Sequence, residues 1–468
     1  MTGRWRTAGR RGRTAGQWRT RRWRTGRWGT AGRRSSGAAG WLALSASLTA
    51  LLTALPPAAS AASAVADGGS GYAFAANART AAGTTGTAGA VLLRPGTTYR
   101  STLPEKGARY YRLELAAATT AYVPVTAVPP TDATVSASDG IGVSVENADG
   151  VSCDYDGARF GAGLSPRPIT ALGRRDANRA LCQGAGTYYL VVERLVTGSK
   201  TTTPGSWNLE IAPVTEPPLA RTGATTAPGT WDSASPEPLT GDPRRRPGGA
   251  GFSTARTLGQ GVWHTDIAPG QTLYYAVPVD WGRQLHATVD LDSSGGDAHG
   301  YVSAALNLSL YNPVRGYVDD LSLGYDGTQK SSSLDPLPPV TYTNRYAVSG
   351  AQNAVRFAGA YYLVVHLTGQ TSAVFGPGPY GVTLRIRVDG APNSGPAYAG
   401  SSEPKGVFDA AAADSGGLLT GGGSDDRAMR ALAVAGIGTG TALLLVLGLW
   451  TLTARRAQIR VNAQKPTA

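Results

Sequence analysis

Cysteine, histidine and methionine are scarce in this chain. Its 468 residues include two cysteines, four histidines and two methionines. Two cysteines without a Cys-x-x-Cys spacing do not indicate a dithiol redox motif or a cysteine-ligated zinc site. The histidines (His264, His286, His299 and His366) lack the HxxxH spacing of zinc enzymes. His286 and His366 fall in predicted strands and are interpreted as ordinary sheet-surface residues. Thiol, imidazole and zinc chemistry are therefore not predicted.

Other catalytic and cofactor motifs are missing as well. The sequence has no Gly-x-Ser-x-Gly nucleophile motif, no GxxxxGK[ST] phosphate loop and no EF-hand spacing. Without a nucleophile, a base and an orienting group in a recognisable pattern, no catalytic residue can be assigned. We expect no cofactor and no enzymatic activity.

Acidic residues are absent from the first 64 positions, which hold twelve arginines. This segment and the basic C-terminal tail account for the formal net charge of +13, since residues 65–454 carry 28 basic against 31 acidic side chains. A nearly neutral central part has no electrostatic footprint for a phosphate backbone. Nucleic acid is therefore not expected as a partner.

Long apolar runs occur near the two ends of the chain. Residues 1–64 are interpreted as an arginine-rich n-region and a signal peptide that ends in a small-x-small cleavage site, Ala62-Ser63-Ala64. Residues 431–454 are uncharged and exceed the ~20 residues that a transmembrane helix needs. The basic residues that follow predict a cytoplasmic C-terminus by the positive-inside rule. The sequence thus predicts a single-pass cell-membrane protein with residues 65–430 outside the cell.

A seven-residue phrase occurs twice, as GTYYLVV at 186–192 and as GAYYLVV at 359–365. Three further blocks match in the same order, with Tyr-Asp-Gly at 155–157 and 325–327 as one anchor. The matched blocks are 106–125 with 269–289, 142–157 with 307–327, and 204–214 with 377–388. Such a long period predicts two complete domains in tandem, because solenoid repeats are only ~20–50 residues long.

The matched blocks alternate apolar and polar residues and are separated by Gly, Pro and Asn-Asp turns, as half-buried strands are. The predicted fold is all-β, with two jelly-roll-like β-sandwich domains. The chain is then divided into the n-region and signal peptide (1–64), a disordered segment (65–89), sandwich 1 (90–213), a Pro-rich linker (214–250), sandwich 2 (251–389), a flexible stalk (390–430), a transmembrane helix (431–454) and a basic cytoplasmic tail (455–468).

Both cysteines lie in the exported part, which favours a structural disulfide between Cys153 and Cys182. Through the repeat, Cys153 aligns with Leu323 and Cys182 with Val355. A cysteine pair in one copy would correspond to an apolar pair in the other. We therefore expect Leu323 and Val355 to be in contact.

Each copy contains, in this order, a Tyr-rich strand, the segment SVENADG or SLYNPVRG, an Asp-Gly turn and a closing strand such as GTYYLVV. This order resembles that of the bacterial pre-peptidase C-terminal domain. That family comprises small secreted β-sandwiches, usually appended to extracellular hydrolases. The resemblance covers about 90–213 and 251–389. No peptidase domain precedes these copies, so the resemblance implies an accessory surface module without catalytic residues.

Two residue groups are candidates for binding. Asp154, Asp156 and Asp326 lie in Asp-rich turns that could hold calcium, although such aspartates more often bond their own backbone. The second group is the tyrosine pairs, whose adjacent rings point to opposite faces of a strand, so that one ring of each pair could be a surface platform. These tyrosines are Tyr110, Tyr111, Tyr274 and Tyr275.

The function expected from the sequence is that of a membrane-anchored extracellular binding or accessory protein. Its partner would be another membrane or secreted protein, or the cell wall. The first alternative is a polysaccharide or cell-wall binding module, and the second is a hydrolase that uses the carboxylate loops. Convergent carboxylates in one cleft would favour the hydrolase.

Overall fold

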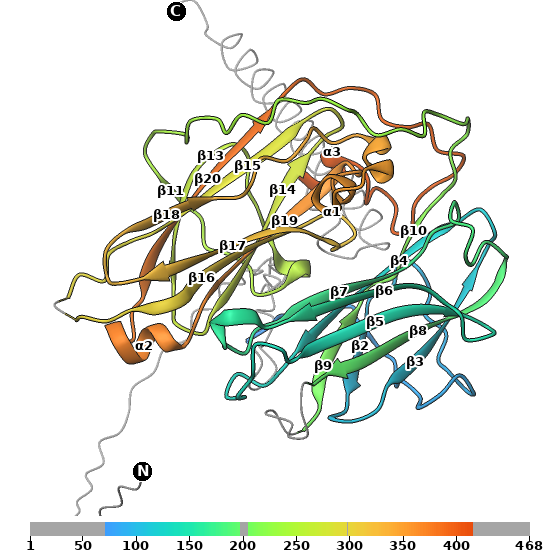
Figure 1. Ribbon diagram of the computed structural model, residues 1–468, viewed down its shortest axis with the longest axis horizontal. Coiled ribbons are helices and arrows are strands. Elements are labelled where there is room, and N and C mark those ends of the chain that lie inside the picture. The colour runs from blue at the N-terminus through green and yellow to red at the C-terminus, as the bar shows by residue number, and fades with distance from the viewer. Residues whose placement is uncertain (1–70, 197–204, 297, 415–468) are drawn as a thin grey trace, which may run out of the picture. The chain divides into compact units, whose positions relative to one another are not determined.

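The structure is a computed structural model that describes residues 71–196, 205–296 and 298–414. The predicted signal peptide, transmembrane helix and cytoplasmic tail lie outside these residues, as do 65–70 and 415–430. Among the helices in the described part of the chain, none is long and apolar enough to cross a membrane. Figure 1 labels the strands and short helices named below.

Sandwich 1 consists of a six-stranded and a four-stranded sheet. The first has the order β1-β2-β9-β4-β10, with β7 on the other side of β4, and the second has the order β3-β8-β5-β6. The strands of the six-stranded sheet are β1 (Arg79–Thr80), β2 (Tyr99–Leu103), β4 (Thr120–Val128), β7 (Ile169–Arg175), β9 (Trp207–Ile211) and β10 (Val214–Glu216). Those of the four-stranded sheet are β3 (Arg109–Leu115), β5 (Gly140–Asn147), β6 (Ser152–Arg159) and β8 (Gly186–Leu195).

Sandwich 2 consists of two five-stranded sheets, in the orders β11-β13-β20-β15-β18 and β12-β14-β19-β16-β17. The first contains β11 (Arg244–Arg245), β13 (Gly261–Ile267), β15 (Gln284–Leu291), β18 (Lys330–Ser333) and β20 (Tyr380–Asp389). The second contains β12 (Arg256–Thr257), β14 (Thr272–Val279), β16 (Val302–Tyr311), β17 (Tyr317–Tyr325) and β19 (Gly359–Leu367). The short helices are the 3-10 turns η1 (Gly161–Gly163), η2 (Phe252–Thr254) and η3 (Tyr342–Tyr346), and α1 (Gly350–Ala354), α2 (Gln370–Phe375) and α3 (Ala410–Asp414).

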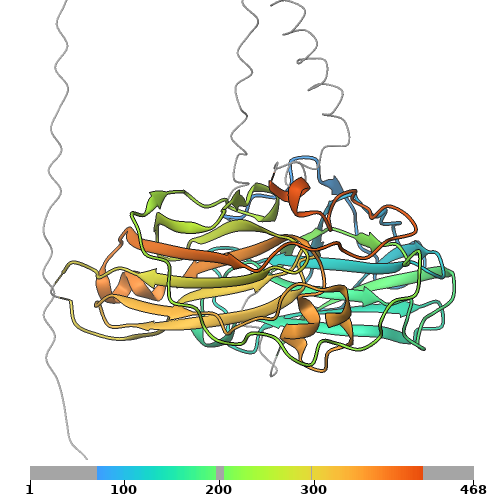
Figure 2. The ribbon, with the colours of Figure 1, turned by 90° about the horizontal axis from the view of Figure 1, so that it is seen from above.

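The predicted duplication is confirmed strand by strand. The order β2-β9-β4-β7 in sandwich 1 corresponds to β13-β20-β15-β18 in sandwich 2, and β3-β8-β5-β6 corresponds to β14-β19-β16-β17. Register agrees too, because Tyr111 pairs with Leu190 as Tyr275 pairs with Leu363. These eight strands form a double-sheet jelly roll in each copy. Figure 2 shows the strands of both copies in stacked layers.

One anchor of the sequence alignment is wrong. Tyr155 lies opposite Ser144 in the middle of β6, whereas Asp320 lies opposite the equivalent Ser309 in sandwich 2. The two Tyr-Asp-Gly triplets are therefore not equivalent, and by register Cys153 corresponds to Val318 rather than to Leu323. A short turn motif can recur at any strand end, so it fixes register less well than a buried strand does. Leu323 and Val355 nevertheless belong to the same buried cluster.

The duplication begins earlier in each copy than the sequence suggested. Residues 79–80 and 244–245 each pair in parallel with the first long strand of their copy. Thr84 bridges Tyr110 as Gly249 bridges Tyr274. The predicted disorder of 65–89 is therefore wrong over 71–89. Main-chain pairing needs no apolar side chain, so Ala- and Gly-rich composition did not reveal these strands.

The predicted linker and stalk are also ordered where the structure describes them. Residues 232–239 cross the outer surface of sandwich 2, where their carbonyls accept hydrogen bonds from Gln284, Arg385 and Arg387. The start of the linker pairs with the predicted stalk through the bridges Thr215 to Glu403 and Leu219 to Tyr398. The start of the linker and the stalk thus provide hydrogen-bond partners for each other's backbone. Amino-acid composition alone cannot show this pairing.

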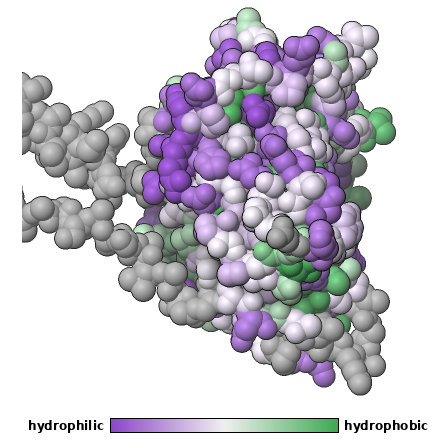
Figure 3. Space-filling model, turned by 90° about the vertical axis from the view of Figure 1, so that its left-hand side faces the viewer, coloured by the Kyte–Doolittle hydropathy of each residue, from purple (hydrophilic) through white to green (hydrophobic). Residues whose placement is uncertain are grey.

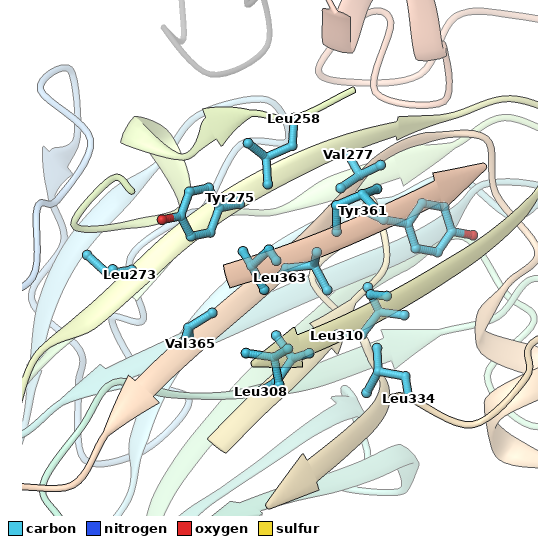
Figure 4. Close-up of a cluster of buried hydrophobic side chains, with 14 of the residues drawn as sticks. Leu258, Leu273, Tyr275, Val277, Leu308, Leu310, Leu334, Tyr361, Leu363 and Val365 are labelled. Carbon is cyan, nitrogen blue, oxygen red and sulfur yellow. The ribbon is translucent and has the colours of Figure 1, made fainter. Parts of the chain in front are cut away.

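The core of sandwich 2 explains the repeated phrase. Tyr361, Leu363 and Val365 alternate along β19 and point into the sandwich beside Leu308 and Leu310 (Figure 4). The intervening Tyr362 and Val364 belong to a different buried cluster on the other side of the sheet. Both faces of β19 are buried, whereas β8 in sandwich 1 is only partly buried. Burying each such large side chain contributes roughly 1.5–3 kcal/mol.

The predicted disulfide is confirmed. Cys153 and Cys182 are bonded, with Cα atoms 5.6 Å apart. Cys153 is in β6, and Cys182 lies in the loop between β7 and β8, so the bond ties that loop to the edge of the sheet. Both sulfurs are partly buried against the core of sandwich 1.

Candidate functional site

The two sandwiches pack against each other through the outer faces of one sheet from each. Tyr274, Tyr362 and Val364 of sandwich 2 share a buried cluster with Val128 of sandwich 1 and with Tyr72 from the N-terminal segment. A second cluster joins Tyr122 and Leu172 to Phe357 and Phe408, among others. The apolar outer face of β19 is therefore an internal junction of the molecule.

This junction corrects the prediction of a tyrosine binding platform. Tyr111 and Tyr275 lie in the cores of their sandwiches, at 0% and 1% exposure. Tyr274 is 1% exposed because Tyr72 and Phe252 cover its ring. Of the four candidates, Tyr110 alone is half-buried. Sequence alternation predicted the outward-facing ring of each pair but could not show that Tyr72 and Phe252 cover it in the second copy.

Two buried carboxylates of sandwich 1 bind arginines of sandwich 2. Glu210, which is fully buried, accepts a 2.7 Å ion pair from Arg315 and a 3.0 Å hydrogen bond from the Tyr72 hydroxyl. The backbone NH of Ala75 donates to its other oxygen at 2.9 Å. Both carboxylate oxygens are satisfied, so this ion pair fixes the geometry of the junction.

The second carboxylate, Glu216, repeats the arrangement. Arg345 donates to it at 2.6 Å, and the hydroxyls of Tyr122 and Tyr398 donate at 2.9 Å each. Burial, followed by the negative charge of Glu216, raises the pKa of Tyr122 far above its ordinary value. The hydroxyl therefore stays protonated and remains a donor.

A histidine makes a third link between the sandwiches. His366 Nε2 lies 2.9 Å from Ser165 Oγ of sandwich 1, and its Nδ1 lies 2.9 Å from Thr272 Oγ1. Burial, reinforced by the nearby charge of Arg167, lowers the pKa of His366 to about 3. The sequence favoured an ordinary sheet-surface histidine here, but the ring is 1% exposed and acts as a neutral connector.

Acid should weaken the folded protein through His366. The folded state keeps the ring neutral down to about pH 3, whereas the unfolded chain protonates it near pH 6.5, so protons favour unfolding between these values. We expect the free energy of unfolding to fall by about 1.4 kcal/mol per unit from about pH 6 to pH 4 on this account. A His366→Gln variant should lack that slope in denaturant titrations. Equal slopes for the variant and the unmodified protein would contradict the assignment.

Beside this histidine, the junction opens into a cleft of about 230 Å³. We call it the junction cleft. Both sandwiches line it, with Asp156 and Arg167 from the first and Asn307, Tyr311, Tyr317 and Asp320 from the second, among others. A ring-sized polar group would fill it, since pockets for drug-sized ligands measure roughly 300–1,000 Å³.

Arg167 is the unusual group of the junction cleft. Its Nη1 is buried, and no atom of the described residues accepts a hydrogen bond from it. Burial lowers the pKa of this guanidinium, and the nearby Tyr311 and Asp320 only partly oppose the effect. An unsatisfied buried donor costs about 1–3 kcal/mol. Because this donor lies at the wall of a cleft, an ordered water or a ligand that enters the cleft can supply its acceptor.

Two tyrosines and an aspartate form the opposite wall. The Tyr311 and Tyr317 rings meet edge to face, with centroids 6.3 Å apart. Burial raises the pKa of Tyr311 to about 12, and burial together with a hydrogen bond to Asp320 raises that of Tyr317. Tyr317 is 50% exposed, so its ring is available at the cleft rim.

The calcium candidates do not come together. Asp154 forms ion pairs with Arg174 and Arg179, at 3.1 and 3.7 Å. Asp156 accepts bonds from the backbone of Leu172 and of its own neighbour Gly157. Asp326, in the other sandwich, pairs with Lys330 at 2.7 Å, and the hydrogen bonds from Lys330 and Thr328 lower its pKa. Among the described residues, no group of three His, Cys, Asp or Glu is placed to hold a metal ion.

The sequence did not point to Arg167 or Tyr317 as functional residues. The available signal was the stretch Ser165-Pro166-Arg167-Pro168, in which two prolines restrict the backbone around a single arginine. Nothing in the sequence, however, places that stretch beside β16 and β17, which lie about 140 residues further along the chain.

No protein-family model and no curated protein matches the chain. Solved structures similar to it include the CUB1-EGF-CUB2 domain of human MASP-1/3, at 7% identity over 62% of this chain and 99% of that chain, with a TM-score of 0.16. The CBM22-1-CBM22-2 tandem domain of Paenibacillus barcinonensis Xyn10C is 11% identical over 63% of this chain and 92% of its own, with a TM-score of 0.17. The tandem CBM51 modules of Sp3GH98, a family 98 glycoside hydrolase from Streptococcus pneumoniae, are 8% identical over 62% and 83%, with a TM-score of 0.17. At these identities and TM-scores the likeness does not extend to function.

Proposed function

We propose that this protein is a non-enzymatic extracellular binding protein, anchored by residues 431–454, which binds its ligand in the junction cleft. The observation that carries the proposal is the buried Arg167 donor without a partner at the wall of a cleft built by both sandwiches. The buried ion pairs of Glu210 and Glu216 hold the two walls together, so the cleft is preorganised.

One face of the molecule also supports a small polar ligand over a broad protein interface. On the face shown in Figure 3, the described residues are mainly hydrophilic or neutral, and hydrophobic residues gather only in small patches. Protein interaction sites are usually larger contiguous apolar areas. Catalysis is not proposed, because Asp154 and Asp156 are engaged by arginines and backbone NH groups. The resemblance to the pre-peptidase C-terminal domain stays a prediction.

The test is site-specific photocrosslinking of the full-length protein in intact native cells. A photoreactive p-benzoylphenylalanine replaces Tyr317 at the cleft rim, and the matched control carries it at Val348, which is fully exposed on sandwich 2. We expect a discrete adduct from position 317 and none from position 348. Equal labelling at both positions, or no adduct at either, would contradict a binding role for the junction cleft. Protein or glycan staining of the adduct then separates an accessory subunit from a polysaccharide-binding module.

A further inference from the structure

The side chains of the junction cleft restrict the chemistry of its ligand. Arg167 presents an unpaired Nη1 donor, and a guanidinium fork binds a planar carboxylate with two parallel hydrogen bonds. A ligand whose anionic group reaches this wall of the cleft would form the strongest hydrogen bonds with Arg167.

The backbone on both sides of Arg167 is restricted. Pro166 and Pro168 fix their own φ angles and restrict Ser165 and Arg167 to extended backbone. Ser165 is in turn anchored to sandwich 2 by the hydrogen bond of its hydroxyl with His366 and by that from the Gly369 NH. A side chain presented by such a segment loses little conformational freedom when it binds.

The carboxylates that line the rest of the cleft favour a ligand with hydroxyl groups and disfavour a highly charged anion. Asp320 accepts a hydrogen bond from Tyr317 through one oxygen, and a carboxylate can accept several more. Asp156 belongs to the wall that sandwich 1 contributes, as Arg167 does. Two carboxylates would repel a phosphate dianion, and the second oxygen of Asp320 can accept a hydrogen bond from a hydroxyl of a monoanion. A ligand with one carboxylate and several hydroxyls matches both walls.

We propose that the junction cleft binds an acidic saccharide, with a hexuronic acid residue whose carboxylate pairs with Arg167 and whose hydroxyls contact Asp320. The half-exposed ring of Tyr317 provides a flat apolar surface for one face of the sugar. This inference rests on the proposed function and specifies its ligand class. The volume of about 230 Å³ suits one sugar ring, with the rest of a chain outside the cleft.

The experiment is isothermal titration calorimetry on the full-length chain in detergent micelles. The probes are oligomers of D-glucuronate, D-galacturonate and D-mannuronate, each beside its methyl ester, which keeps the ring but removes the charge. We expect at least one acid to bind and its ester to bind about tenfold more weakly or not at all. A teichoic-acid-type glycerol phosphate polymer is the phosphate-bearing comparison.

Variants connect the binding to the cleft. Arg167→Gln should weaken acid binding by about tenfold or more, while Arg256→Gln, an exposed arginine on β12, should leave it within about twofold. The melting temperature of Arg167→Gln should fall less than that of Arg175→Leu, because the lost Nη1 makes no hydrogen bond in the folded protein whereas the Arg175 guanidinium makes several. A purely structural arginine would show the opposite pattern, with a lower melting temperature and unchanged affinity.

Failure of this inference is distinguishable from failure of the proposed function. If no uronic acid binds in an Arg167-dependent way, or if the glycerol phosphate polymer binds instead, the acidic saccharide is wrong. The photocrosslink at position 317 then decides the proposed function, since an adduct there keeps a binding role for the cleft. If no uronic acid binds in an Arg167-dependent way and position 317 also gives no adduct, both the acidic-saccharide proposal and the proposed binding function are wrong.

Discussion

Replacing Glu210 by alanine should destabilise the protein by about 3–5 kcal/mol, because it leaves Arg315 buried without its counter-charge. The Arg315 side chain is only 13% exposed, so water cannot take the place of the carboxylate. The variant also leaves the hydroxyl of Tyr72 and the NH of Ala75 without their acceptor. Chemical denaturation of the full-length protein, followed by tyrosine and tryptophan fluorescence, measures the effect.

The chain contains a matched control for this pair. Arg245 and Asp266 are also 2.7 Å apart, but they are 67% and 38% exposed. Asp266→Ala should cost only about 0–1 kcal/mol, because solvent screens exposed ion pairs. A Glu210→Leu, Arg315→Met double variant should recover part of the stability lost in Glu210→Ala, since an apolar pair can replace a buried ion pair but leaves Tyr72 and Ala75 without their acceptor. Similar losses for Glu210→Ala and Asp266→Ala would show that burial is not the decisive factor.

Replacing Arg175 by leucine should have an effect of similar size on sandwich 1. This arginine is fully buried and donates to the carbonyls of two loops instead of to a carboxylate. Its acceptors are the carbonyl oxygens of Ala116, Ala117, Thr119, Cys182, Gln183 and Gly184, at 2.6 to 3.2 Å. Without the guanidinium these carbonyls lose their partner, and we expect a loss of about 3–5 kcal/mol.

Two further variants show whether the guanidinium itself is responsible. Arg175→Lys keeps the charge but has three donors in place of five, so it should recover only part of the lost stability. Arg179→Leu removes an exposed arginine from the neighbouring loop, where its 3.7 Å pair with Asp154 is weak, and should cost less than about 1 kcal/mol. Full rescue by lysine would contradict the role assigned to the geometry of the fork.

The sequence by itself determined the fold class, the duplication and the disulfide. Alternation of apolar and polar residues indicates strands whatever surrounds them, and GTYYLVV and GAYYLVV align two copies because buried strands tolerate little variation. The prediction that Cys153 pairs with Cys182 needed only an even count and the prediction that this part of the chain is exported. The turn motif at 155–157 and 325–327 failed as an anchor, since turn residues respond to local geometry and not to register.

The tertiary structure alone decided which surfaces are exposed. The outward ring of a Tyr-Tyr pair meets either water or another part of the protein, depending on residues that are distant in the chain. Tyr110 is half-buried, whereas its counterpart Tyr274 is fully buried. The same holds for Glu210 and Arg315, which are 105 residues apart and form one ion pair. The junction cleft exists only because two sheets meet at their outer faces, and its Arg167, Tyr317 and Asp320 come from both copies. A residue pattern describes one element at a time, whereas a junction depends on two.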